Sequence, residues 1–173
     1  MSDAANYPVH DKILKAASLP QLFSKNGSYL LPMAYPEGCP VHPALPGGHA
    51  AIAGACVTVL KAYFNENYVF PNPVMPNDDG TALVPYRGEL MVGAELNKLA
   101  SNIAYGRDTA GMHWRTDEIE GLKLGEAVAI SVLAGFNGCF NENFDGYTLT
   151  KFDGQTIRIN GQATPIAKVV RAA

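Results

Sequence analysis

Apolar residues recur along most of this chain at helical spacing, three or four positions apart. In one stretch, for example, Ile52, Cys56, Val59 and Tyr63 would all fall on one helical face. The same spacing predicts helices over residues 10–25, 50–65, 89–105 and 114–136. Pro20 is expected to bend or interrupt the first of them, because proline lacks the backbone N–H that a helix interior requires.

Glycine and proline separate these helical stretches. Residues 32–48 are rich in both residue types, and residues 68–85 contain four prolines and the turn Asn77-Asp78-Asp79-Gly80, which favours loops. Near the C-terminal end, residues 147–152 and 156–159 are rich in strand-forming residues and flank Asp153-Gly154, a sequence typical of a hairpin turn. The pattern therefore predicts a mainly α fold, a helical bundle with a small C-terminal β-hairpin, and a single domain over residues 1–173.

Composition narrows the class of protein. Apolar residues make up 47% and charged residues 17% of the chain, a balance typical of a globular domain. The formal net charge of −3 does not suggest a surface for nucleic acid or anionic membrane. No apolar run approaches the ~18 residues of a membrane-spanning helix, and the first residues do not resemble a signal peptide. The compartment is left open by these observations.

A glycine-rich run opens the second predicted helix. Gly47, Gly48 and His49 lie where backbone N–H groups are unpaired and the helix dipole is positive, an arrangement that suits an anion. The glycines allow the backbone to approach an oxyanion closely, and the histidine can donate to it or move a proton. The same run is also typical of a tight turn that merely leads into a helix.

A second cluster joins the last two predicted helices. Arg107 offers a forked donor for an oxyanion, and His113 and Asp117 are spaced as neighbours on one helical turn. A carboxylate behind a histidine fixes its tautomer and raises its basicity as a ligand. Taken alone, this cluster could equally be a salt-bridged helix start. His42, in Val41-His42-Pro43, taken alone is a loop histidine.

The two clusters in this order resemble the signature motifs of the superfamily that joins vanadium haloperoxidases and type 2 phosphatidic-acid phosphatases. Pro46-x-Gly48-His49 is followed by Arg107-x5-His113-x3-Asp117. The stretches over residues 31–49, 95–100 and 152–159 are similar to bromoperoxidases of the red-algal and bacterial type. The resemblance covers nearly the whole chain from about Tyr7 and points to the C-terminal part of a longer haloperoxidase.

The resemblance implies a role for each motif residue. His113 would be the axial ligand of vanadium in a bound vanadate, and Asp117 would support it from behind. His49 would be the acid–base histidine, and His42 would lie near the halide. The oxyanion would be held by Gly48, through its backbone N–H, by Arg107 and by the turn at Gly47.

The chain departs from the family pattern in two places. The motif usually has serine where this chain has Gly47, so one hydroxyl hydrogen bond is expected to be lost. The family's first motif, a lysine followed by Arg-Pro, is not found: no arginine precedes Arg87, and none of Lys12, Lys15 or Lys25 leads such a pattern. The chain is therefore expected to begin just after that motif.

Three functions follow as expectations. The first is a vanadate-dependent haloperoxidase domain that oxidises bromide or iodide with hydrogen peroxide to hypohalous acid, for transfer to an organic halogen acceptor. The alternatives are an inactive truncated or split subunit and an acid-phosphatase-like phosphohydrolase. Because two of the predicted helices are apolar on more than one side, we expect a homo-oligomer, most simply a dimer, or a complementing N-terminal chain. Nucleic-acid and membrane partners are not expected.

Overall fold

A computed structural model describes residues 15–29, 41–160 and 163–165. The chain divides into two compact units, Met1–Cys39 and Pro40–Ala173, which are treated separately. In the first, helix α2 spans Ser18–Asn26, and residues 10–14 of the predicted helix lie outside the described residues. Residues 15–17 of the predicted helix are not helical, so α2 begins only two residues before Pro20. Pro20 therefore lies in the first turn, where no backbone N–H needs a helical partner.

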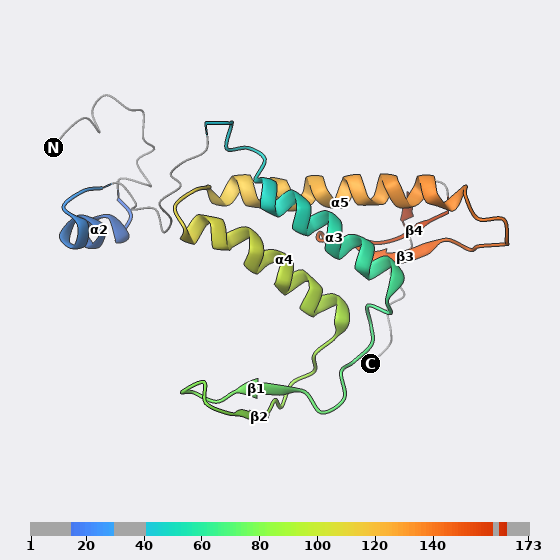
Figure 1. Cartoon of the computed structure of the whole chain (residues 1–173), viewed down its shortest axis with the longest axis horizontal. Coiled ribbons are helices and arrows are strands. Elements are labelled where there is room, and N and C mark those ends of the chain that lie inside the picture. The colour runs from blue at the N-terminus through green and yellow to red at the C-terminus, as the bar shows by residue number, and fades with distance from the viewer. Residues whose placement is uncertain (1–14, 30–40, 161–162, 166–173) are drawn as a thin grey trace. The chain divides into compact units, whose positions relative to one another are not determined.

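Three helices form the frame of the second unit: α3 (Gly48–Tyr63), α4 (Val92–Thr109) and α5 (Arg115–Asn137). All three were predicted, with ends displaced by one to four residues. Figure 1 shows α4 and α5 meeting at the loop that joins them and diverging from there, with α3 crossing beside α5. The fold is mainly α, as the sequence predicts. Among the described helices none has the length and apolar character needed to span a membrane.

Small residues allow α3 and α5 to pack backbone against backbone. A side chain at Gly54 or Gly125 would collide with the main chain of the facing helix. A Cβ atom at Gly121 would lie 2.7 Å from the carbonyl oxygen of Gly47 and 2.8 Å from the Cβ atom of Ala50. This close packing brings the first turn of α3 against the first turn of α5, and so sets the position of both predicted motifs.

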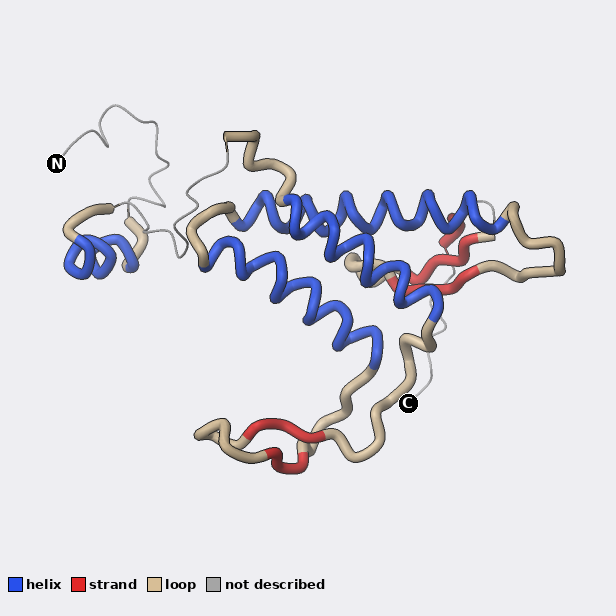
Figure 2. The backbone as a smooth tube through the Cα atoms, viewed as in Figure 1, coloured by secondary structure: helices blue, strands red, loops and turns tan. Residues whose placement is uncertain are grey.

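A hairpin occupies the stretch that the sequence indicated as a loop. Strands β1 (Val74–Pro76) and β2 (Leu83–Pro85) pair antiparallel and stand apart from the other sheet (Figure 2). Their turn is tied by Asn77, whose N–H donates to the Ala82 carbonyl and whose side-chain oxygen accepts the Ala82 N–H. The prolines at the ends of both strands concealed them in the sequence, since proline is tolerated only at strand ends and edges.

The predicted C-terminal hairpin is present and gains a third strand. Strands β3 (Tyr147–Thr150), β4 (Thr156–Ile159) and β5 (Ala163–Pro165) form an antiparallel sheet in that order. Its inner face packs on α5 in a core of buried residues, namely Leu133, Tyr147, Leu149, Ile157 and Ile159. The sheet thus covers the C-terminal half of α5 and leaves its first turns to form the site.

A buried lysine links the helices to this sheet. Lys61 of α3 is 1% exposed, and its Nζ atom donates to the Thr150 carbonyl at 2.7 Å and to the Asn97 side chain at 3.2 Å. Burial lowers the pKa of Lys61, and the carboxylates of Glu126 and Glu66 offset part of this effect. The lysine therefore ties α3, α4 and β3 together at one point.

Replacing Lys61 with alanine is expected to destabilise the protein by about 3–5 kcal/mol, because it leaves buried acceptors and carboxylates without their cation. Lys61→Met keeps the aliphatic stem and should cost less. Urea unfolding followed by circular dichroism measures both changes. A Lys61→Ala protein within about 1 kcal/mol of wild type would show that the linkage contributes little.

Candidate functional site

The first turn of α3 presents the glycine-rich motif. Gly47 is buried, and its N–H donates to the Asp117 carbonyl at 2.9 Å, while Gly48 and His49 are exposed. The helix begins at Gly48, two residues before its predicted start, so His49 lies inside the first turn. The backbone N–H groups of such a turn have no carbonyl partners within the helix, which makes this end of α3 suited to an anion.

The loop between α4 and α5 carries the second motif. The side chain of His113 is 5% exposed, and its Nδ1 atom lies 3.4 Å from Oδ2 of Asp117. The same Asp117 oxygen accepts the backbone N–H of Trp114 at 3.0 Å, which caps the start of α5. The structure therefore places Asp117 behind His113, but the carboxylate oxygen that faces the imidazole is shared with a helix cap.

Arg107 lies in the last turn of α4, just before the loop that carries His113. Its Nη2 atom contacts the sulfur of Met112 at 2.7 Å, which draws the arginine toward the loop that leads to His113. Its positive charge acts on the buried carboxyl group of Glu118 at the start of α5. Arg107, His113 and Glu118 thus form one cluster where the three helix ends meet.

Two acidic residues of this cluster were missed by the sequence analysis. Glu118 is fully buried, and Asp108 is half-buried; neither oxygen of Glu118, nor Oδ1 of Asp108, has a hydrogen-bond partner among the described residues. Burial raises the pKa of both carboxyl groups, and the charge of His113 offsets only part of the effect. The signal was present in the adjacent acids Asp117 and Glu118, but acidic residues in a first turn are also typical of ordinary helix starts.

His42 lies in the exposed stretch that leads to α3. Its Nδ1 atom is 2.8 Å from the carbonyl oxygen of Pro43, so its ring contact is local. The contacts described above join Gly47 to the His113 cluster through Asp117 and Glu118. The approach of His42 and of the His49 side chain to that cluster stays a prediction.

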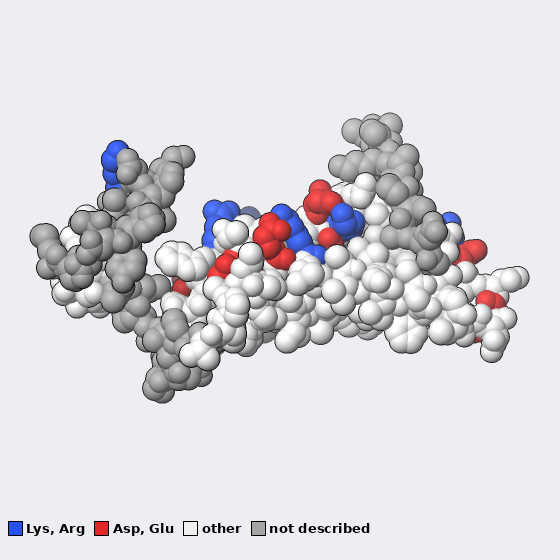
Figure 3. Space-filling view, turned by 90° about the horizontal axis from the view of Figure 1, so that it is seen from above, with Lys and Arg blue, Asp and Glu red and all other residues white. Residues whose placement is uncertain are grey.

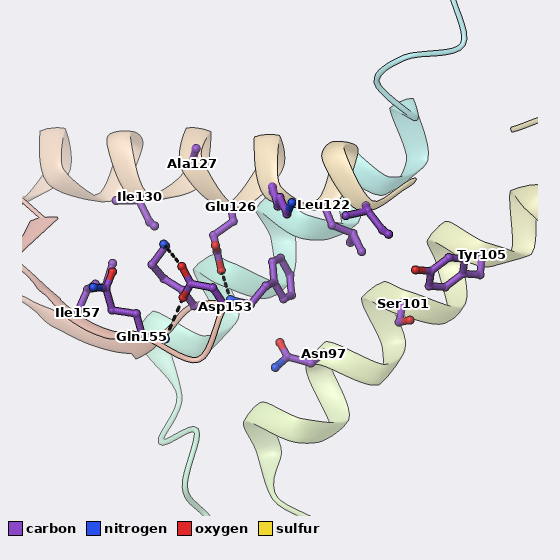
Figure 4. Close-up of a pocket in the computed structure, with 14 residues that line it drawn as sticks. Asn97, Ser101, Tyr105, Leu122, Glu126, Ala127, Ile130, Asp153, Gln155 and Ile157 are labelled. Carbon is purple, nitrogen blue, oxygen red and sulfur yellow. Dashed lines mark hydrogen bonds and ion pairs between the residues drawn. The ribbon is translucent and has the colours of Figure 1, made fainter. Parts of the chain in front are cut away.

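A separate cavity of about 740 Å³ opens between α4, α5 and the turn of the C-terminal sheet. Figure 4 shows Asn97, Ser101 and Tyr105 on one side of it and Glu126 on the other. Glu126 is buried and accepts the Phe152 N–H at 2.7 Å. None of the motif residues lines this cavity, but Tyr105 and Ile119 do, and they are close in sequence to Arg107 and Glu118.

Comparison with known proteins assigns the family. The model of the VCPO second helical-bundle domain matches residues 24–142. The chain belongs to the vanadium haloperoxidase family. The vanadium-dependent bromoperoxidase of Corallina officinalis is 48% identical over 134 residues, covering 76% of this chain. That of Ascophyllum nodosum is 41% identical over 149 residues, covering 80% of this chain.

A solved structure agrees with this assignment. The second vanadate-dependent bromoperoxidase of Ascophyllum nodosum, described as a homohexamer, matches this haloperoxidase chain with a TM-score of 0.77 and 32% identity over 94% of the chain. The chain spans 22% and 27% of the length of the two curated bromoperoxidases and 35% of the solved one. It therefore corresponds to part of a vanadium haloperoxidase.

The donors of the cluster fit the vanadate that the names of these relatives imply. One imidazole, one guanidinium and the first turn of α3 can meet a tetrahedral oxyanion. The charges fit less well, because three carboxyl groups, those of Asp108, Asp117 and Glu118, surround His113. These carboxyl groups bring no positive charge to an anion.

Proposed function

We propose that this chain forms the vanadate-binding part of a haloperoxidase that oxidises bromide or iodide with hydrogen peroxide to hypohalous acid. The observation that carries the proposal is the buried His113, backed by Asp117 and Glu118 and placed beside the first turn of α3. Bound vanadate supplies a Lewis-acidic centre that activates hydrogen peroxide toward halide without a change of oxidation state. An organic acceptor then takes the halogen.

Each motif residue has a role in this proposal. His113 offers its Nε2 atom to vanadium, while its Nδ1–H is held from behind by a carboxylate. Arg107 and the backbone N–H of Gly48 neutralise the oxyanion, and the absence of a side chain at Gly47 lets α5 approach. His49 takes a proton from hydrogen peroxide, and His42 lies on the halide side. The roles of His42 and His49 rest on the family resemblance.

The competing proposal is an inactive subunit or one half of a split enzyme. The carboxyl groups of Asp108 and Glu118 favour this proposal, because they bring no positive charge to an anion site. Burial raises the pKa of both groups. A lysine and an arginine from another segment would supply the positive charge that an anion site needs. Such a segment belongs either to a longer form of this protein or to a complementing N-terminal chain.

The surface also points to a partner polypeptide. Figure 3 shows a broad face without charged side chains, and many large apolar residues of the three helices are exposed. On α5 alone these are Leu124, Val128, Val132 and Phe136. Exposed apolar surface of this extent usually marks an interface. We propose that further copies of this chain or an N-terminal segment cover it; the homohexameric relative supports assembly of the first kind.

The test is bromination of a phenolic dye by the purified protein with vanadate, hydrogen peroxide and bromide, with and without an N-terminal segment of a relative. His49→Ala should lower turnover by about 10²–10⁴, the usual contribution of a general base, and should leave vanadate affinity nearly unchanged. His42→Ala serves as the matched histidine control for vanadate affinity. Equal loss of affinity and turnover in His49→Ala would reject its assignment to proton transfer.

A further inference from the structure

Glu118 occupies an unusual position for a carboxylate. It is 0% exposed, and neither of its side-chain oxygens has a hydrogen-bond partner among the described residues. A buried polar group without a partner is costly and therefore rare in folded proteins. The Nδ1 atom of His113 lies 4.0 Å from Oε1 of Glu118.

Gly47 provides the space in which this carboxylate lies. A Cβ atom at position 47 would be 2.7 Å from Oε2 and 3.0 Å from Oε1 of Glu118. The Gly47 backbone cannot easily withdraw, since its N–H is bonded to the Asp117 carbonyl. The position at which the superfamily motif usually carries a serine is therefore filled by a carboxyl group from α5.

Asp117 is not well placed to accept a hydrogen bond from Nδ1 of His113. Its Oδ2 atom already accepts the Trp114 N–H at 3.0 Å, and its 3.4 Å separation from His113 is long for a hydrogen bond. Neither side-chain oxygen of Glu118 accepts a hydrogen bond from any residue that the structure describes. A small change in the side-chain torsions of Glu118 would bring Oε1 within hydrogen-bond distance of Nδ1, because only about 1 Å separates 4.0 Å from an ordinary N–H···O contact.

We propose that Glu118 is a positioning residue of the oxyanion site. Its carboxylate accepts the Nδ1–H of His113 and so fixes the tautomer in which the Nε2 lone pair faces the oxyanion. Gly47 makes this arrangement possible, and the pair Gly47–Glu118 takes the place of a serine on α3. The inference rests on the proposed function for its purpose, but the contact between His113 and Glu118 can be tested without any bound anion.

The first experiment reads the tautomer of His113 in the full chain by ¹⁵N NMR, with no vanadate present. We expect the Nδ1–H form to dominate in wild type and in Glu118→Gln, whose amide keeps an acceptor oxygen. In Glu118→Met, which has similar volume and no strong acceptor, the Nε2–H form should gain. An unchanged tautomer in a folded Glu118→Met protein overturns the inference, even if the haloperoxidase proposal stands.

The second experiment measures affinity for inorganic vanadate by titration calorimetry. Glu118→Met should weaken binding by about 10- to 100-fold, the usual effect of removing the support behind a ligating histidine, and Glu118→Gln should recover most of it. Equal affinity in Glu118→Met and wild type would count against the role. If wild type binds no vanadate, either alone or with the N-terminal segment of a relative, the proposed function fails, and the tautomer measurement alone decides the inference.

A double-mutant cycle tests the exchange between positions 47 and 118. Gly47→Ser should lower the melting temperature when Glu118 is present, because the new side chain meets its carboxylate. In a Glu118→Ala background the same substitution should cost much less, since the space is free. Additive effects would show that the two positions are independent. They would overturn the inference that Glu118 occupies the place of the motif serine.

Discussion

His113→Ala should abolish measurable binding of vanadate and of inorganic phosphate. His113 is the one histidine of the motif cluster whose side chain the structure shows buried beside carboxylates, and in the proposed function it alone bonds to the metal. Loss of that bond should lower vanadate affinity by about 100-fold or more, equivalent to about 3 kcal/mol. Titration of the wild-type and variant proteins with each anion measures the change.

The matched control for this prediction is Lys98→Ala. Lys98 is an exposed cation of α4 that pairs with Glu95 at 2.6 Å, so its loss removes a positive charge without touching the motif cluster. Its affinity for both anions should remain close to that of wild type. Retention of binding within about twofold in a folded His113→Ala protein would remove His113 as the vanadium ligand.

Local signals were sufficient for most of the fold. The helices were predictable because their apolar positions follow a helical period over many residues, and the C-terminal hairpin because Asp153-Gly154 is a strong turn signal. The β1–β2 hairpin was not, since Pro76 and Pro85 end its strands and every strand residue is exposed. Without a buried face, such strands have no alternation of apolar and polar residues to detect.

The candidate site shows a sharper limit. The sequence predicted that His42, His49, Arg107 and His113 converge on one pocket, and this stays a prediction. The structure joins Gly47 to Asp117, and Asp117 to His113, through local contacts and the packing of α3 on α5. Glu118 was overlooked because its importance depends on the absence of a side chain at Gly47, on another helix. The glycine was interpreted as the loss of a hydroxyl group, whereas the structure shows that it admits a carboxyl group.

The burial of Lys61 was equally hidden. A lysine in the last turn of a helix is usually an exposed residue that complements the helix dipole. Its burial depends on Thr150 and Asn97, which are contributed by a strand and a helix remote in sequence. Periodicity within one helix carries no information about such long-range polar contacts, so only the tertiary structure reveals them.

Supplying a lysine and an arginine from outside the chain is expected to strengthen vanadate binding by about 10²–10⁴. Each hydrogen bond to a charged group contributes about 1.5–3 kcal/mol, so two of them give roughly 3–6 kcal/mol. The suitable reagent is an N-terminal segment of a bromoperoxidase relative that carries the Lys-x6-Arg-Pro pattern, co-expressed with this chain. Calorimetric titration with vanadate and the rate of dye bromination should both rise.

A second effect of the segment distinguishes its coverage of exposed apolar residues from the positive charge that it supplies. The segment should cover exposed apolar residues such as Val128 and Phe136, so an apolar dye should bind less and light scattering should report a larger particle of defined mass. A control segment with both cations replaced by methionine should still reduce dye binding but leave vanadate affinity unchanged.

If the control strengthens vanadate binding as much as the native segment does, the isolated chain binds vanadate weakly because its pocket lacks structural support and not because it lacks positive charge. If neither segment associates and the chain alone is a monomer that binds no apolar dye, the apolar face is not an interface, and the proposals of a complementing chain and of an oligomer both fail.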